Sequence, residues 1–180
     1  MAKTGRAWLA TNAKEDGVIV LPSGLQYRIL RTSEPASKSP LFETACVCQY
    51  RGTLVDGTEF DSSHKRGRPA TFAPCQVIKG WAEAMQIMAE GDKWQLFVPP
   101  ELAYGDSSRG AHIGPGAVLI FELEILKVHG EVAERTAVVH TAESRAALTK
   151  PDGGPPPPHA EKGRRVQIIG LESKPSFNDQ

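Results

Sequence analysis

The sequence predicts an α+β fold in which a curved antiparallel β-sheet wraps around one short α-helix. Several stretches between residues 18 and 129 alternate apolar and polar side chains with a period of two. That pattern is typical of strands with one buried face and one wet face, which are usually antiparallel. A single stretch after Gly80 instead spaces its apolar residues as a helix does, and one helix packed on such a sheet is an α+β arrangement.

The chain begins with a polar, Ala-rich lead at residues 4–16, which we expect to be helical and to end at Gly17. Its apolar residues Trp8, Leu9 and Ala13 are too few for a strong amphipathic stripe. Isolated helices of this length are marginal in water, so the lead either packs on the domain or frays.

The strand predictions rest on the alternation of apolar and polar side chains along the chain. The apolar positions that share one parity are Leu25, Tyr27 and Ile29; Cys46, Cys48, Tyr50 and Leu54; Trp94, Leu96 and Val98; and Leu119, Phe121, Leu123 and Ile125. The second stretch ends at Asp56-Gly57, a dipeptide that favours a tight hairpin. The predicted helix carries Trp81, Ala84, Met85 and Met88 and closes at Glu90-Gly91; its stripe is expected to pack on the sheet.

We divide the chain into a helical lead at residues 1–20, a domain at 21–129 and a C-terminal region at 130–180. Residues 130–150 are rich in Ala and Glu, and a helix is an option there. The run Pro155 to Pro158 favours polyproline II, and we expect a mostly disordered tail, with a docking site for a polyproline-reading domain as the alternative.

Composition excludes several classes of protein. The chain has 21 Lys+Arg and 21 Asp+Glu, and a neutral chain is a poor general nucleic-acid binder. No apolar run reaches the 18 residues that suggest a membrane span. The N-terminus lacks the apolar core of a signal peptide, so we expect a cytoplasmic protein; a trimmed signal peptide would make it secretory or periplasmic.

The sequence gives little sign of metal or redox chemistry. Three cysteines without CxxC spacing make a poor disulfide framework, so we expect Cys46 and Cys48 to be buried thiols and leave some reactivity to Cys75. The histidines are scattered without ligand spacing, and no G-x-S-x-G, P-loop, H-E-x-x-H or GxGxxG motif is present. We expect no metal and no cofactor. The stretch 65–69 contains R-G-R-P, read as a solvated hairpin tip rather than a minor-groove hook.

Aromatic residues gather near turns and element ends: Tyr50, Phe60, Phe72, Trp81, Tyr104 and Phe121. Trp81, in the first turn of the helix and close to Val77 and Ile78, is well placed to form the floor of a pocket between helix and sheet. Asp61 follows Phe60 and is the acidic group expected beside that pocket; the alternative is a turn or cap residue.

Five blocks then occur in order: Tyr50-Arg51-Gly52-Thr53-Leu54, Asp56 to Ser63 (DGTEFDSS), Val77-Ile78-Lys79-Gly80-Trp81, Leu102-Ala103-Tyr104-Gly105 and Val118 to Leu126 (VLIFELEIL). Together they resemble the FKBP family of peptidyl-prolyl cis-trans isomerases. The lead from Asn12 to Tyr27 is similar to the macrophage-infectivity-potentiator branch, and the resemblance covers about residues 12–128.

The resemblance implies a role for each site residue. Trp81 would be the floor, and the walls would be Tyr50, Phe60, Phe72, Val77, Ile78, Ile113 and Phe121. Tyr104 would donate a hydrogen bond at the rim, the Ile78 N–H would bind a ligand carbonyl, and Arg66 would pair with Asp61. Two positions depart from the family: Ala70 replaces an aromatic wall residue, and Gly114 replaces a proline in the loop after Tyr104.

The resemblance further implies catalysis of X-Pro rotation in polypeptides, a role in protein folding as a chaperone, and binding of macrolides of the tacrolimus and rapamycin class. We expect no nucleic-acid or membrane partner, and a monomer, because the lead before Gly17 is short for the branch's helical dimer interface. Two other hypotheses are a binding module in which turnover is incidental and a scaffold acting through the Pro-rich tail.

Overall fold

A seven-stranded antiparallel sheet forms the body of the structure, a computed structural model that describes residues 2–34 and 37–134. Its strands are β1 (Val18–Val20), β2 (Gln26–Arg31), β4 (Ala45–Leu54), β5 (Glu59–Ser62), β6 (Ala70–Phe72), β7 (Lys93–Val98) and β8 (Leu119–His129). They lie in the order β1-β2-β7-β8-β4-β5, and β6 pairs with β4. The predicted strands and the antiparallel sheet are confirmed.

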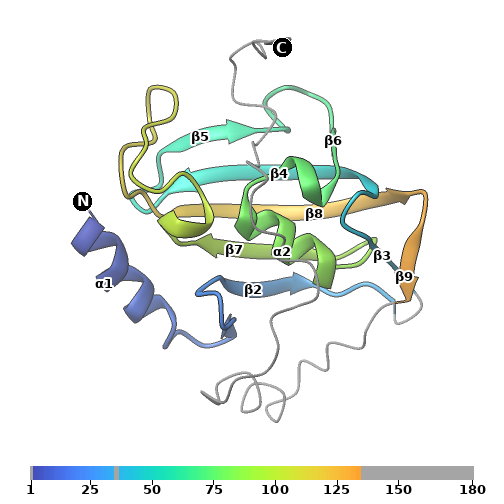
Figure 1. The fold of residues 1–180 in the computed structure, drawn as a ribbon, viewed down its shortest axis with the longest axis horizontal. Helices are drawn as coiled ribbons and strands as arrows, with labels where there is room; N and C mark the ends of the chain where they lie inside the picture. Colours follow the sequence, from blue (N-terminus) through green and yellow to red (C-terminus); the bar gives the residue numbers. More distant parts are fainter. Residues whose placement is uncertain (1, 35–36, 135–180) are drawn as a thin grey trace, which may run out of the picture.

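Helix α2 (Lys79–Ile87) lies against one face of this sheet (Figure 1). Ala84, Met85 and Met88 are fully buried, so the apolar stripe read from the sequence does pack on the sheet. The helix approaches β7 closely at Gly80, where an added Cβ would stand 2.6 Å from a methyl carbon of Val98. The α+β prediction is therefore confirmed, with a short helix brought tightly onto the sheet.

The core between α2 and the sheet follows the period-two pattern. Tyr50, Leu96, Phe121 and Leu123 have 1% or less of their surface exposed. Glu122, of the other parity, lies on the opposite face of the sheet and forms an ion pair with Lys93 at 3.5 Å. Burial of one parity on four neighbouring strands fixes the register, because a slip of one residue would expose the whole apolar set.

Helix α1 (Ala2–Asn12) packs on the opposite face of the sheet. Its Leu9 joins a small second core with Val18, Phe97 and Val118, and the Trp8 ring lies 5.8 Å from that of Phe97. The side chain of Asn12 donates a 2.9 Å hydrogen bond to Gln26 on β2. The lead is thus helical over residues 2–12, and of the two options it packs rather than frays.

A second, two-stranded sheet joins β3 (Lys38–Pro40) to β9 (Val132–Glu134). The helix considered for residues 130–150 is therefore wrong at residues 132–134, where pairing with β3 overrides a weak helical pattern. Residues 135–180, with the predicted tail, lie outside the described residues. The division of the chain at residues 20 and 129 stays a prediction.

Strands β5 and β6 share one edge of β4. Residues 51–53 of β4 pair with β5, and residues 46–48 pair with β6. The loop 63–69, exposed at residues 64–69, links these two strands. It is not the hairpin tip that the sequence suggested, because its flanking strands pair with β4 and not with each other. The predicted hairpin does occur one step earlier, between β4 and β5, where Gly57 adopts φ +87°.

Candidate active site

Trp81, at the start of α2, lies among three other aromatic rings. Its ring centroid is 5.1 Å from Tyr50, 5.1 Å from Phe121 and 5.8 Å from Phe72. The interplanar angles of 78° to 83° are edge-to-face, the arrangement that aromatic quadrupoles favour. Phe60 extends the cluster, with its ring perpendicular to that of Phe121 at 5.5 Å. Strands β4, β5, β6 and β8 and helix α2 thus meet in one aromatic cluster.

The backbone before α2 offers a hydrogen-bond donor beside this cluster. Val77 and Ile78 are extended, and the Ile78 carbonyl accepts the first helical bond, 2.9 Å from the Ala82 nitrogen. Within residues 2–34 and 37–134, the Ile78 N–H has no acceptor. Such an orphan donor is normal at the N-terminal end of a helix and can be satisfied by a ligand carbonyl.

A polar triangle closes one side of the cluster. The Tyr50 hydroxyl donates a 2.6 Å hydrogen bond to Asp61 and accepts one of 2.5 Å from Arg66. Arg66 also bonds to the other carboxylate oxygen of Asp61, whose side chain is only 6% exposed. Burial, reinforced by the bond to Asp61, raises the pKa of Tyr50. The pairing of Arg66 with Asp61 is present as the resemblance implied.

Ser63 holds this triangle in place. Tyr50 lies between the β5 and β6 segments of the β4 edge, where neither strand pairs with it. The Ser63 N–H donates to the Tyr50 carbonyl at 3.0 Å, and the Ser63 hydroxyl oxygen accepts from the Tyr50 N–H at 2.8 Å. Ser63 is fully buried, so it satisfies both backbone groups where no strand does.

The segment after η2 (Pro100–Leu102) forms the rim. Tyr104 is half-buried against the main core, and burial raises its pKa to about 12. Ile113, 3% exposed, belongs to that core, and its backbone exchanges two hydrogen bonds with Arg109. The guanidinium carbon of Arg109 stands 5.1 Å from the centroid of the Tyr104 ring. A cation and a phenol therefore stand together at the edge of the aromatic cluster.

Every site residue expected from the sequence falls in this region. The fully or nearly buried members are Tyr50, Phe72, Val77, Ile78, Trp81, Ile113 and Phe121, and the partly buried members packed against them are Phe60 and Tyr104. Asp61 and Arg66 join through Tyr50. Ala70 also packs on the cluster, with far less volume than an aromatic ring. The roles of these residues stay predictions.

Three features of this region were missed in reading the sequence. Gly52 lies under the rings, and an added Cβ would stand 2.7 Å from Phe60 and 2.8 Å from Phe121. The bonds of Ser63 and the stacking of Arg109 on Tyr104 also escaped notice. A glycine on the buried parity of a strand is a signal for close approach that could have found the first.

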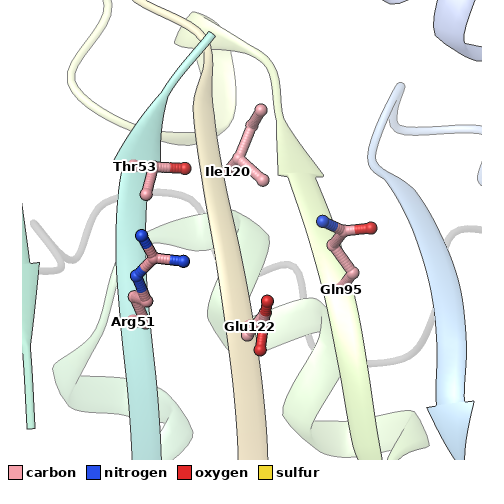
Figure 2. Close-up of a pocket in the computed structure, with 5 residues that line it drawn as sticks. All are labelled: Arg51, Thr53, Gln95, Ile120 and Glu122. Carbon is pink, nitrogen blue, oxygen red and sulfur yellow. The ribbon is translucent and has the colours of Figure 1, made fainter. Parts of the chain in front are cut away.

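Two hollows lie on the other face of the sheet. One of about 80 Å³ is lined by Arg51, Thr53, Gln95, Ile120 and Glu122, whose side chains lie over β4, β7 and β8 (Figure 2). The other, about 370 Å³, lies beside α1 and shares Gln95 and Ile120 with the first. Neither contains a residue of the aromatic cluster. We place the candidate site at the cluster, because apolar side chains, the orphan N–H of Ile78 and the nearly buried carboxylate of Asp61 come together there.

All three cysteines are free thiols. Cys46 and Cys48 are buried and unbridged, as expected, and burial raises the pKa of Cys46 to about 12. Cys75 is half-buried and also free. In the part of the chain that the structure describes, no group of three His, Cys, Asp or Glu side chains is arranged to hold a metal ion.

Comparisons with known proteins agree with this architecture. The family model "FKBP-type peptidyl-prolyl cis-trans isomerase" matches residues 37–126, and "Domain amino terminal to FKBP-type peptidyl-prolyl isomerase" matches residues 1–29. The outer membrane protein MIP of Legionella longbeachae is 49% identical over 124 residues, which are 69% of this chain and 52% of that protein. The macrophage infectivity potentiator of Trypanosoma cruzi is 43% identical over 136 residues, 75% of this chain and 68% of that protein.

A solved structure of a related protein has a similar fold. The crystal structure of FkpA from Escherichia coli aligns with a TM-score of 0.66 and 37% identity, covering 70% of this chain and 58% of that one. The chain thus spans about half the length of the Legionella relative and of FkpA. These matches, with the aromatic cluster and its polar triangle, lead to one conclusion: the chain belongs to the FKBP-type peptidyl-prolyl cis-trans isomerase family, in its macrophage-infectivity-potentiator-like branch.

Proposed function

We propose that this chain catalyses cis-trans rotation about X-Pro bonds in polypeptides, at the aromatic cluster centred on Trp81. The observation that carries the proposal is the enclosure of Trp81 by Tyr50, Phe72 and Phe121, with the half-buried Phe60 beside them. Family membership supports it, since the matched family is described by this activity.

The physical task is to lower a rotational barrier. Amide resonance sets that barrier at roughly 18–20 kcal/mol, and the twisted transition state has lost the resonance, so its carbonyl is less polar. An apolar aromatic surface disfavours the planar, polar ground state more than the twisted state. An acceleration of about 10⁵ requires about 7 kcal/mol of such differential binding. No covalent intermediate is needed.

The cluster must open for a proline ring to reach the indole. Trp81 is 0% exposed and its Nε1 is a buried donor without an acceptor among the described residues, whereas Phe60 and Tyr104 are partly exposed. We therefore propose that substrate first contacts Phe60 and Tyr104 and that side chains covering Trp81 then move aside. The Ile78 N–H would receive a substrate carbonyl.

Asp61 acts in this proposal as a fixed charge. Both of its oxygens are held, one by Tyr50 and one by Arg66, so it is poorly placed to accept a substrate proton. The Tyr104 hydroxyl, whose pKa burial raises to about 12, is protonated at neutral pH, as a hydrogen-bond donor must be. These groups orient and polarise the amide and do not transfer protons.

A protease-coupled assay on a proline peptide tests the proposal. We expect the intact chain to accelerate isomerisation and Phe60→Ala to lower kcat/KM at least tenfold while the variant stays folded by circular dichroism. Tyr27→Phe is the control, since Tyr27 stacks on Trp94 at 4.4 Å and not on Trp81. Full activity of folded Phe60→Ala would overturn the placement of the site.

Ligands and cellular role follow as further proposals. Macrolides of the tacrolimus and rapamycin class would compete for the same apolar surface, and assistance to protein folding would follow from turnover on client chains. Turnover separates this reading from a binding module, which would hold a proline segment without accelerating its rotation. The scaffold hypothesis depends on residues outside the described part of the chain.

The proposed location changes from the sequence expectation. The name of the Legionella relative describes it as an outer membrane protein, which favours the secretory or periplasmic alternative and gives no support to a cytoplasmic location. In residues 2–34 and 37–134, no helix is long and apolar enough to cross a bilayer. The monomeric state stays a prediction.

A further inference from the structure

Arg109 occupies a fixed position beside Tyr104. Its backbone N–H donates to the Ile113 carbonyl at 2.8 Å, and its carbonyl accepts from the Ile113 N–H at 3.2 Å. Gly110, with φ +58°, allows the chain to reverse direction between these two residues. Because Ile113 is buried in the main core, this short turn is anchored, and the guanidinium stacks 5.1 Å above the Tyr104 ring.

The charge of Arg109 is not neutralised by the surrounding groups. Arg66, the other arginine near the cluster, is bound to Asp61 and Tyr50. Within the described residues no carboxylate forms an ion pair with Arg109, not even Asp106 in the same segment. Arg109 is exposed, so its guanidinium is open to a bound molecule.

The cation also lies within electrostatic range of the site. Arg109 lowers the pKa of Tyr104 and Asp61 raises it, so both charges act on this phenol, and the carboxylate of Asp61 is already paired with Arg66. A peptide whose proline lies against Tyr104 would carry its neighbouring side chains past Arg109. The guanidinium that lies over the Tyr104 ring is then a positive charge close to those side chains.

We propose that Arg109 is a specificity-determining residue that favours peptides with an acidic side chain directly before or after the isomerised proline. This inference rests on the proposed isomerase function and names the substrate class of the same site. An exposed charge pair has a modest effect, so we expect a preference of about two- to fivefold in kcat/KM for a Glu peptide over its Gln counterpart.

The test measures exchange between cis and trans peptide by NMR, without a coupling protease, for Ac-Ala-Ala-Xaa-Pro-Ala-Ala-NH₂ and Ac-Ala-Ala-Ala-Pro-Xaa-Ala-NH₂. Xaa is Glu, Gln or Lys, at pH 7 and low salt. We expect Glu to exceed Gln and Gln to exceed Lys in at least one series. The Glu/Gln ratio should approach 1 in Arg109→Gln, persist in Arg109→Lys and persist in Arg68→Gln, which removes an exposed cation from the loop 63–69.

The Glu/Gln ratio is measured within one variant, so a smaller amount of folded protein lowers both rates equally and leaves the ratio unchanged. If Arg109→Gln does not fold, raising the salt concentration on the parent protein still tests the idea, because screening shortens to about 3 Å at 1 M and should abolish the preference. If the parent protein accelerates exchange of the Gln peptides but shows no preference for the Glu peptides, the role of Arg109 is wrong and the isomerase function still stands. Failure to accelerate any peptide would overturn the proposed isomerase function itself.

Discussion

Phe60 lies against the backbone of Gly52, so closely that a methyl group on Gly52 would stand 2.7 Å from two carbons of the phenyl ring. The same methyl would stand 2.8 Å from Phe121. Gly52 pairs with Asp61 on β5 and with Phe121 on β8, so it lies at the centre of the proposed site. A residue without a side chain is what allows Phe60 and Phe121 to meet edge to face.

Gly52→Ala should therefore displace Phe60. We expect a loss of about 1–3 kcal/mol in the free energy of unfolding, as overpacking gives, and at least a tenfold fall in kcat/KM. Urea unfolding and the isomerase assay measure the two effects. Gly114→Ala is the stability control, because an added Cβ there meets nothing within 4 Å. Parent-like stability and activity of Gly52→Ala would contradict this packing.

Tyr50→Phe removes the hydroxyl that joins Asp61 to Arg66 and keeps the ring that contacts Trp81. We expect kcat/KM to fall roughly three- to tenfold, the range given by about 1 kcal/mol of lost hydrogen bonding. The measurement is kcat/KM on a neutral peptide, with Tyr27→Phe as the matched removal of a buried phenol oxygen. Equal effects of the two substitutions would show that the triangle has no part in turnover.

Ser63→Ala should loosen the loop that carries Arg66. The Tyr50 N–H loses its acceptor, and a buried unpaired donor costs about 1–3 kcal/mol of stability. We expect a matching fall in the urea midpoint together with faster amide exchange in residues 63–69. Ser62→Ala serves as control, because its hydroxyl makes only a long 3.4 Å contact with the Lys65 N–H. A destabilisation no larger than the control's would argue against the anchor.

The tyrosines should lose their phenolic protons at a higher pH in the folded protein than in the unfolded chain. The chain has three, Tyr27, Tyr50 and Tyr104, and burial raises the pKa of each, to about 12 for Tyr27 and Tyr104. Because the folded pKa values lie above the unfolded value near 10, their contribution to stability is complete below pH 10 and is lost as pH rises towards 12. Absorbance at 295 nm should show phenolate above pH 11 in the folded protein and near pH 10 in denaturant. A folded midpoint near 10 would contradict the burial.

Turnover, by contrast, should be nearly flat between pH 6 and 8. Tyr50 and Tyr104, whose pKa values are raised above the ordinary value near 10, are protonated throughout this range, and both oxygens of Asp61 are held by Tyr50 and Arg66. His112, exposed in the loop near Arg109, should alter substrate affinity at most a few-fold. The measurement is kcat across this range for the parent and His112→Ala. A steep bell that disappears in His112→Ala would mean that proton transfer is part of the mechanism.

Much of this architecture can be read from alternation and spacing. Period-two burial locates β2, β4, β7 and β8, and the stripe of Ala84, Met85 and Met88 locates α2, because tertiary burial and local pattern agree there. The short strands β3 and β9 are missed, since three residues carry too little periodicity and their pairing is decided by contacts distant in the chain. The aromatic site residues and Asp61 were found from their positions near turns and element ends, and the multi-residue motifs added Arg66, Ile113 and the expected role of each residue.

What the sequence could not supply is the relation between side chains. The Arg109–Tyr104 stacking depends on a turn whose direction is set by Ile113, and the bonds of Ser63 depend on β5 and β6 sharing one edge of β4. Both follow from three-dimensional packing, and neither residue type signals it alone. The packing of α1 on the sheet likewise depends on Phe97, which local alternation places on the wet face.

The central claim is that this chain accelerates X-Pro rotation at the cluster around Trp81, and cis-trans exchange NMR on a neutral peptide tests it most directly. Uncatalysed exchange takes tens to hundreds of seconds at 25 °C. With the protein well below the peptide concentration, we expect exchange fast enough to give cross-peaks, together with shifts of the Trp81 and Phe60 resonances, and loss of both effects in folded Phe60→Ala. Peptide binding at Trp81 without faster exchange would contradict catalysis and leave a binding module.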